Sequence, residues 1–274
     1  CERWERAAEA YEAITAWLGE SQEPVDIYLL DRVIGQGGYA SSEWVAVSYP
    51  DRHYAPVELG SVIRHELVHR LDDALECDDA PAAVREGLAV YLAGGHYRTE
   101  SLRDKASVLL ASPRRIPLDE LVVDFYTHQH EVAYLQAGAV IQYLVEHYGW
   151  EVLEPMCEAA SEQAGDETEK WEAALDAVDI DDGRELEIDW ETWLMGGDAD
   201  AEDERLLDLE LRLMETMRAY QAAYDPAAHY VHGILFSPEE AAEREIVADF
   251  VRRPREPEAV AMELVLAMAQ EAVD

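Results

Sequence analysis

The stretch from His65 to His69 limits what this chain can fold into more than any other. It reads H-E-L-V-H and lies inside a run from Val57 to about Leu75 whose apolar residues recur at helical spacing. This periodicity predicts an α-helix. Residues four apart lie on the same face of a helix, so His65 and His69 point the same way. Glu66 is the next residue after His65 and lies to one side of this helical face. The sequence therefore predicts a helix that presents two imidazoles beside a carboxylate.

Two imidazoles at this spacing can bind one metal ion. The H-E-x-x-H pattern on a helix is typical of a metalloprotease site, with His65 and His69 as zinc ligands and Glu66 as the general base. A motif with three fixed positions also occurs by chance. The alternative interpretation is a helix with two incidental histidines and a surface glutamate.

Glu86 is the expected third ligand. A catalytic zinc site usually takes three protein ligands and leaves one position for water. The next helix is predicted from Pro81 to Leu92, and Asp79 and Pro81 mark its start. Glu86 falls in the middle of this otherwise apolar helix, where a buried, unpaired carboxylate is costly. A zinc ion would remove that cost. The alternative is an ordinary glutamate that is solvated or paired with an arginine.

These motifs resemble the gluzincin metallopeptidases, a clan whose third ligand is a glutamate on the helix after H-E-x-x-H. The likeness rests on R-H-E-L-V-H-R-L, on P-x-x-x-x-E-G-L-A-V-Y-L and on a later helical run from Ala133 to Gly149. It is closest to compact bacterial members of the clan. An amphipathic segment ending in W-E-T-W-L at 190–194 extends the resemblance over about residues 1–196.

The resemblance implies both a reaction and a ligand set. His65, His69 and Glu86 would bind Zn²⁺, and Glu66 would act as the general base that activates a metal-bound water. The expected activity is hydrolysis of a peptide bond in a peptide or protein substrate. The sequence does not distinguish an endopeptidase from an exopeptidase.

Two further features follow from the resemblance. One is a tyrosine whose hydroxyl hydrogen-bonds the developing oxyanion. Tyr134 is the best match, and Tyr126 and His128 are its rivals. The other is an edge strand above the metal, expected at residues 44–49, to which an extended peptide could pair through its main chain. An ordinary strand of a small sheet is the alternative interpretation.

A second function class stays open, namely a non-catalytic binding or assembly module that contains zinc and is tethered at the surface. Structural zinc sites tend to be closed by four protein ligands. A fourth ligand from His96 or His128 would therefore favour this class. The intact H-E-x-x-H motif argues against it, because a purely structural zinc does not need Glu66.

The pattern predicts an α+β fold that is predominantly helical. A helix at 2–19 and β-like runs at 25–30 and 44–49 precede the metal helices, and helices fill the chain to 195. Residues 1–196 are expected to form the metallopeptidase domain, with a small N-terminal sheet packed on the H-E-x-x-H helix and a helical subdomain after it. An acidic hinge at 197–204 and a helical extension at 205–274 follow. Residues 35–38 are expected to form a loop.

The charge balance excludes several partners. The chain has 21 basic and 60 acidic residues, a net charge of −39. Phosphate contacts need a basic surface, so nucleic acid is excluded as a partner. Electrostatic docking on anionic lipid is disfavoured for the same reason. An acidic surface suits solubility at high salt. The compositional habit of a GC-rich genome is the alternative explanation.

The cysteines favour export. A mature chain that begins with cysteine looks like a bacterial lipoprotein acylated at that residue, so we expect an exported protein tethered to a membrane only through Cys1. The alternative is a chance boundary of the chain. Cys77 and Cys157 form an even pair, which fits an oxidising compartment, although two free buried thiols are the other interpretation. No apolar run approaches the ~18 residues of a membrane span.

Overall fold

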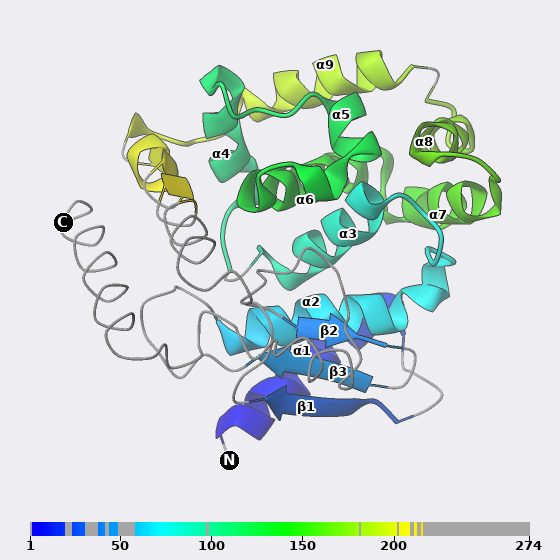
Figure 1. Ribbon diagram of the computed structural model, residues 1–274, viewed down its shortest axis with the longest axis vertical. Helices are drawn as coiled ribbons and strands as arrows, with labels where there is room; N and C mark the ends of the chain where they lie inside the picture. Colours follow the sequence, from blue (N-terminus) through cyan, green and yellow to red (C-terminus); the bar gives the residue numbers. More distant parts are fainter. Residues whose placement is uncertain are drawn as a thin grey trace, which may run out of the picture.

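The computed structural model describes residues 2–19, 24–30, 38–41, 44–48, 58–96, 99–180, 182–201, 203–208, 211, 212 and 215. Within these residues a small mixed sheet lies near the N-terminus and helices make up most of the rest (Figure 1). This confirms the predicted α+β, predominantly helical fold class. No helix in the described ranges is long and apolar enough to cross a membrane.

Apart from one short strand, β2, the elements follow the predicted order. The helices are α1 (Glu2–Leu18), α2 (Leu59–Leu71), α3 (Ala82–Ala93), α4 (Leu102–Ser107), α5 (Leu118–Val123), α6 (His130–Tyr148), α7 (Leu153–Glu162), α8 (Glu167–Asp176) and α9 (Gly183–Leu194). The strands are β1 (Asp26–Leu30), β2 (Gly38–Ala40) and β3 (Trp44–Ser48). Short 3-10 turns cover Asp72–Leu75, Val108–Ala111, Phe125–Thr127 and Trp150–Val152.

The strand order is β1-β3-β2, so β3 is central. β1 runs parallel to β3, with Asp26 opposite Trp44, and β2 runs antiparallel to it, with Gly38 opposite Val47. The expectation that residues 44–49 form the edge strand is therefore wrong, because β2 covers that edge. The loop expected at 35–38 is wrong at Gly38, which begins β2, and its other residues lie outside the described part of the chain. A three-residue strand is too short to show alternation in the sequence.

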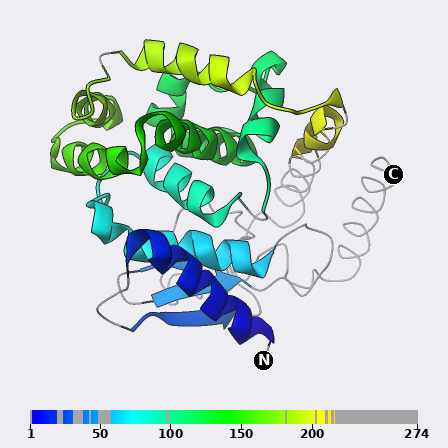
Figure 2. The same cartoon turned by 180° about the vertical axis from the view of Figure 1, so that it is seen from behind.

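The helix α2 lies between the sheet and α3, and α1 crosses it on the side seen in Figure 2. Ile63, Leu67 and Val68 are fully buried, and the polar residues His65 and Glu66 are also buried. A helix with neighbours on several sides buries most of its surface. The sheet therefore packs on the H-E-x-x-H helix as predicted, and that helix is held firmly in place.

The helical subdomain is built around α6, which lies against α3 (Figure 1). The two backbones approach closely at Gly87. A Cβ atom built there would lie 2.7 Å from the carbonyl oxygen of Ala137. Only glycine fits this contact, and it sits directly after Glu86 in the chain. The close packing of α3 on α6 therefore helps to fix the position of Glu86.

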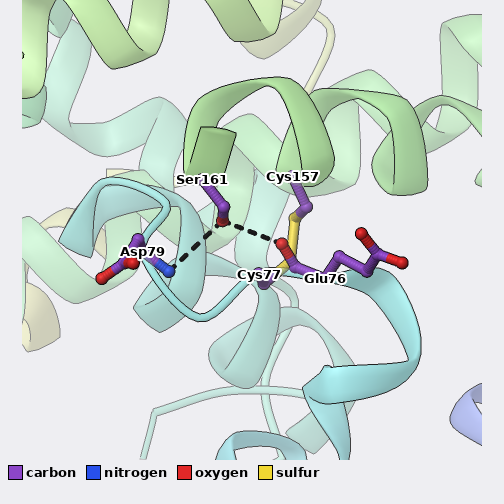
Figure 3. The surroundings of a disulfide bond; sticks show 5 residues. All are labelled: Glu76, Cys77, Asp79, Cys157 and Ser161. Atoms are coloured by element: carbon purple, nitrogen blue, oxygen red, sulfur yellow. Dashed lines mark hydrogen bonds between the residues drawn. A yellow bond between two sulfur atoms is a disulfide. The ribbon is translucent and has the colours of Figure 1, made fainter. Parts of the chain in front are cut away.

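A disulfide between Cys77 and Cys157 ties the α2–α3 connection to α7 (Figure 3). The same connection is held by Ser161, whose hydroxyl donates to the carbonyl of Glu76 at 2.8 Å and accepts from the backbone N–H of Asp79 at 3.2 Å. The bridge spans a sequence separation of 80 residues. On the chain-entropy model it stabilises the fold by roughly 4 kcal/mol.

The C-terminal part of the chain begins by packing on the same core. The backbone N–H of Asp198 donates to Asp104 at 2.9 Å, and residues 203–208 are helical. Leu207 and Leu211 are buried in the core that runs from α1 to α9. The division into a domain at 1–196, a hinge and an extension at 205–274 stays a prediction, since most of the extension lies outside the described residues.

Candidate metal centre

The structure brings together the three predicted ligands. One turn of α2 separates His65 from His69, and their Nε2 atoms lie 3.2 Å apart. Glu86 on α3 faces both of them. Its Oε2 atom lies 3.1 Å from the Nε2 atom of His65 and 3.3 Å from that of His69. Within the described ranges, this is the one group of three such side chains placed to share a metal ion.

The spacing of these atoms fits a bound metal ion. Two atoms bonded tetrahedrally to one zinc ion at about 2.0–2.1 Å lie about 3.3 Å apart. The three distances between the donor atoms of His65, His69 and Glu86 all fall close to this value. The buried His-His-Glu group can therefore hold a metal ion.

The ligands are largely buried, and this shapes their protonation. Burial opposes a charge on His69, but the neighbouring carboxylate of Glu86 outweighs it and raises the pKa of His69 to about 9. Burial likewise works against ionised Glu86, but His69 and His65 hold the pKa of this carboxyl well below its ordinary value. Without a metal ion, the site therefore holds a protonated His69 against an ionised Glu86.

Glu66 lies in the same cleft but outside the ligand group. Its side chain is 6% exposed, and burial raises the pKa of its carboxyl, partly offset by His65 and His69. A backbone hydrogen bond from Gly38 favours the ionised form. A Cβ atom built on Gly38 would lie 2.7 Å from the Cδ atom of Glu66. Strand β2 therefore packs directly on the expected general base, with room only for glycine.

Two tyrosines reach the site from the α5–α6 region. The hydroxyl of Tyr126 donates to the Oε1 atom of Glu86 at 2.9 Å. The ring of Tyr134 lies 6.1 Å from the ring of His65, and both tyrosines line the cleft. Burial and the charge of Glu86 raise the pKa of each hydroxyl. Both therefore keep their proton at neutral pH and can donate a hydrogen bond.

The other histidines considered from the sequence point elsewhere. His128 lies with its Nε2 atom 3.2 Å from the backbone carbonyl of Glu120. The Nε2 atom of His96 lies 2.9 Å from that of His130. Neither His96 nor His128 joins this group, so the described residues supply three candidate ligands and no fourth.

The ligands open into a cavity of about 340 Å³. Tyr39 and Ala40 of β2 line it, together with Asp72, Asp78 and Arg85. Asp72 lies one turn after His69, and its charge contributes to the raised pKa of that histidine. The spacing of Asp72 from His69 was a signal in the sequence that went unused. Tyr126 was considered only as a rival of Tyr134. No local pattern could have found its contact with Glu86, or that of Gly38 with Glu66, because each contact joins segments distant in the chain.

No family model matches this chain, and no curated protein or solved structure is similar enough to match it. The likeness to gluzincins consequently stays a hypothesis drawn from the motifs.

Proposed function

We propose that this protein is a zinc-dependent peptidase of the gluzincin type. One observation carries the proposal: the buried carboxylate of Glu66 lies in the cleft beside the ligand group without being one of its three ligands. A site that used zinc only for stability would need neither this carboxylate nor an open position, because structural zinc sites are closed by four protein ligands.

The donor set supports zinc as the metal. Two imidazoles and one carboxylate are a ligand set of catalytic zinc sites, although imidazole also suits copper, iron and nickel. His65, His69 and Glu86 would hold the ion. When bound, zinc supplies a Lewis acid that polarises a carbonyl group and lowers the pKa of a water molecule.

Glu66 would move the proton. Burial raises the pKa of the Glu66 carboxyl toward neutral pH. A general base works best when its pKa lies near the operating pH. Glu66 would accept a proton from water and pass it to the leaving amine. We assign Tyr134 as the donor that hydrogen-bonds the developing oxyanion. The hydroxyl groups of Tyr126 and Tyr134 both hydrogen-bond Glu86, so the choice of Tyr134 rests on the resemblance to the gluzincins.

The test is cleavage of an unbiased peptide mixture by the zinc-loaded protein over a range of salt concentrations. Glu66→Gln keeps the size and the buried position of the side chain but removes the base. We expect this variant to bind zinc and to lose turnover. Glu154→Gln is the matched control, since it makes the same change at an exposed position of α7 and should retain full activity. Glu86→Ala should lose most of the metal.

The outcomes separate the two function classes. Turnover that persists in Glu66→Gln would rule out its role as the base. Full zinc occupancy in Glu86→Ala would remove this residue from the ligand set. Zinc bound by the wild type without cleavage of any peptide would favour the surface-tethered binding or assembly module.

We also propose that the protein is exported. The disulfide between Cys77 and Cys157 supports this, because such bonds persist in oxidising compartments. Cys1, the expected lipidation site, lies outside the described residues.

A further inference from the structure

A second cavity of about 370 Å³ adjoins the metal cleft. The two cavities share Asp78, Arg85 and Tyr126 in their linings. From this shared wall the second cavity runs past the start of α3 and the end of α5 to Glu167 and Lys170 of α8. A peptide lying across the metal cleft could therefore place a side chain, or its own end, in the second cavity.

Arg85 forms part of the wall between the two cavities. Its Nε atom is buried and has no hydrogen-bond partner among the described residues. A buried donor without an acceptor is costly and calls for a partner, which the described residues do not supply. Arg85 directly precedes Glu86 on α3, so any group that it binds lies beside the metal ligands.

The other cation of the second cavity is already engaged. The Nζ atom of Lys170 donates to the backbone carbonyl of Asp79 at 2.8 Å and lies 3.9 Å from the carboxylate of Glu167. The start of α3 adds positive potential, because no side chain caps it and its first turn holds no acidic residue. Ala82, the first residue of α3, lines the same cavity.

We propose that Arg85 binds a carboxylate group of the substrate in the second cavity. The planar guanidinium group matches the geometry of a carboxylate and stays charged at any relevant pH. The carboxylate would be either an acidic side chain or the C-terminus of the peptide. The inference rests on the proposed peptidase function and assigns a substrate class to it.

The acidic side chains of the second cavity oppose the binding of a carboxylate. Asp78, Asp79, Asp124 and Glu167 also line the second cavity, so a carboxylate approaches against negative charge. Direct contact with Arg85 has to offset this repulsion, helped by the positive potential at the start of α3. Salt screens the repulsion between distant charges more than a contact at a buried atom. The preference for a carboxylate should therefore grow as salt is raised.

Binding of a defined peptide set tests the inference without relying on turnover. The protein is the zinc-loaded Glu66→Gln variant, and the probes are alanine-based hexapeptides in which one glutamate is moved along the chain. Each has a twin with glutamine in place of glutamate, and each is made with a free and with an amidated C-terminus. The first comparison reports a side-chain carboxylate and the second a terminal one.

We expect one of these carboxylates to strengthen binding by about tenfold, as a charged hydrogen bond would. Adding Arg85→Gln should remove the difference within the pair, and Arg85→Lys should restore part of it. Lys170→Gln is the matched control, because it removes one positive charge from the same cavity. It should leave the preference unchanged.

Three results would overturn the inference: equal affinity within every pair, a preference that survives Arg85→Gln, or no binding of any peptide. Turnover of the same peptides by the wild type judges the proposed function separately. Cleavage without a preference for a carboxylate would contradict carboxylate binding by Arg85 and leave the peptidase function standing. Binding that depends on Arg85, with no cleavage, would contradict the peptidase function and leave carboxylate binding by Arg85 standing.

Discussion

The hydroxyl of Tyr126 donates a hydrogen bond to the Oε1 atom of Glu86 at 2.9 Å, while the Oε2 atom of the same carboxylate faces His65 and His69. Tyr126 and the two histidines thus face different oxygens of this carboxylate. Tyr126 therefore fixes the orientation in which Glu86 meets the histidines. It comes from the 3-10 turn between α5 and α6, far along the chain from both metal helices.

Removing this hydrogen bond should weaken metal binding. We expect Tyr126→Phe to lower zinc affinity by roughly 10–100-fold, as is usual for groups that orient a metal ligand. Tyr134→Phe removes a second hydrogen bond to Glu86 and should lower turnover even when zinc is saturating. Competition with a fluorescent chelator measures affinity, and peptide cleavage at saturating zinc measures turnover. Unchanged affinity in Tyr126→Phe would show that Glu86 is held by its packing alone.

Zinc binding should release a proton at neutral pH. Glu86 raises the pKa of His69 to about 9, so this histidine is protonated in the metal-free protein and must lose its proton to become a ligand. Apparent zinc affinity should fall by about tenfold for each pH unit below this pKa and level off above it. Calorimetry in two buffers of different ionisation enthalpy measures the proton count. Heats that do not depend on the buffer at neutral pH would contradict the expectation.

Gly38→Ala should disable the general base without releasing the metal. The new methyl group would overlap the Glu66 side chain, with its carbon 2.7 Å from the Cδ atom, so the carboxylate must move. We expect turnover to drop by roughly 100-fold, which is the scale of effect for a small misplacement in an active site. Zinc content by elemental analysis should not change. Activity equal to that of the wild type would show that the shift is harmless.

Gly87→Ala should destabilise the protein. Its Cβ atom would meet the carbonyl of Ala137 on α6, and overpacking of this kind costs roughly 1–3 kcal/mol. Gly60→Ala is the control. The nearest atom to its Cβ lies 3.6 Å away, at the end of Arg64, so alanine fits and should stabilise α2 by roughly 0.5–1 kcal/mol. Urea unfolding of both variants measures the free energies. A loss of stability in both would mean that the packing of α3 on α6 is not the cause.

Much of the helical structure could be predicted because it is local. The run around His65 shows helical periodicity, and the helix observed there spans Leu59–Leu71. The helix that carries Glu86 begins one residue after Pro81. Strand β2 was missed because three residues carry too little pattern. The position of β3 in the centre of the sheet was also missed, since strand order depends on pairing between distant segments.

The sequence by itself determined which side chains could share a metal ion. The spacing of four residues between His65 and His69 places both imidazoles on one helical face, and an isolated Glu86 in an apolar helix has few other uses. Only the tertiary structure decided what surrounds these groups. It placed Gly38 against Glu66, Tyr126 against Glu86 and Arg85 between two cavities. Such contacts depend on how separate elements pack in space, and the periodicity of a single segment carries no information about that packing.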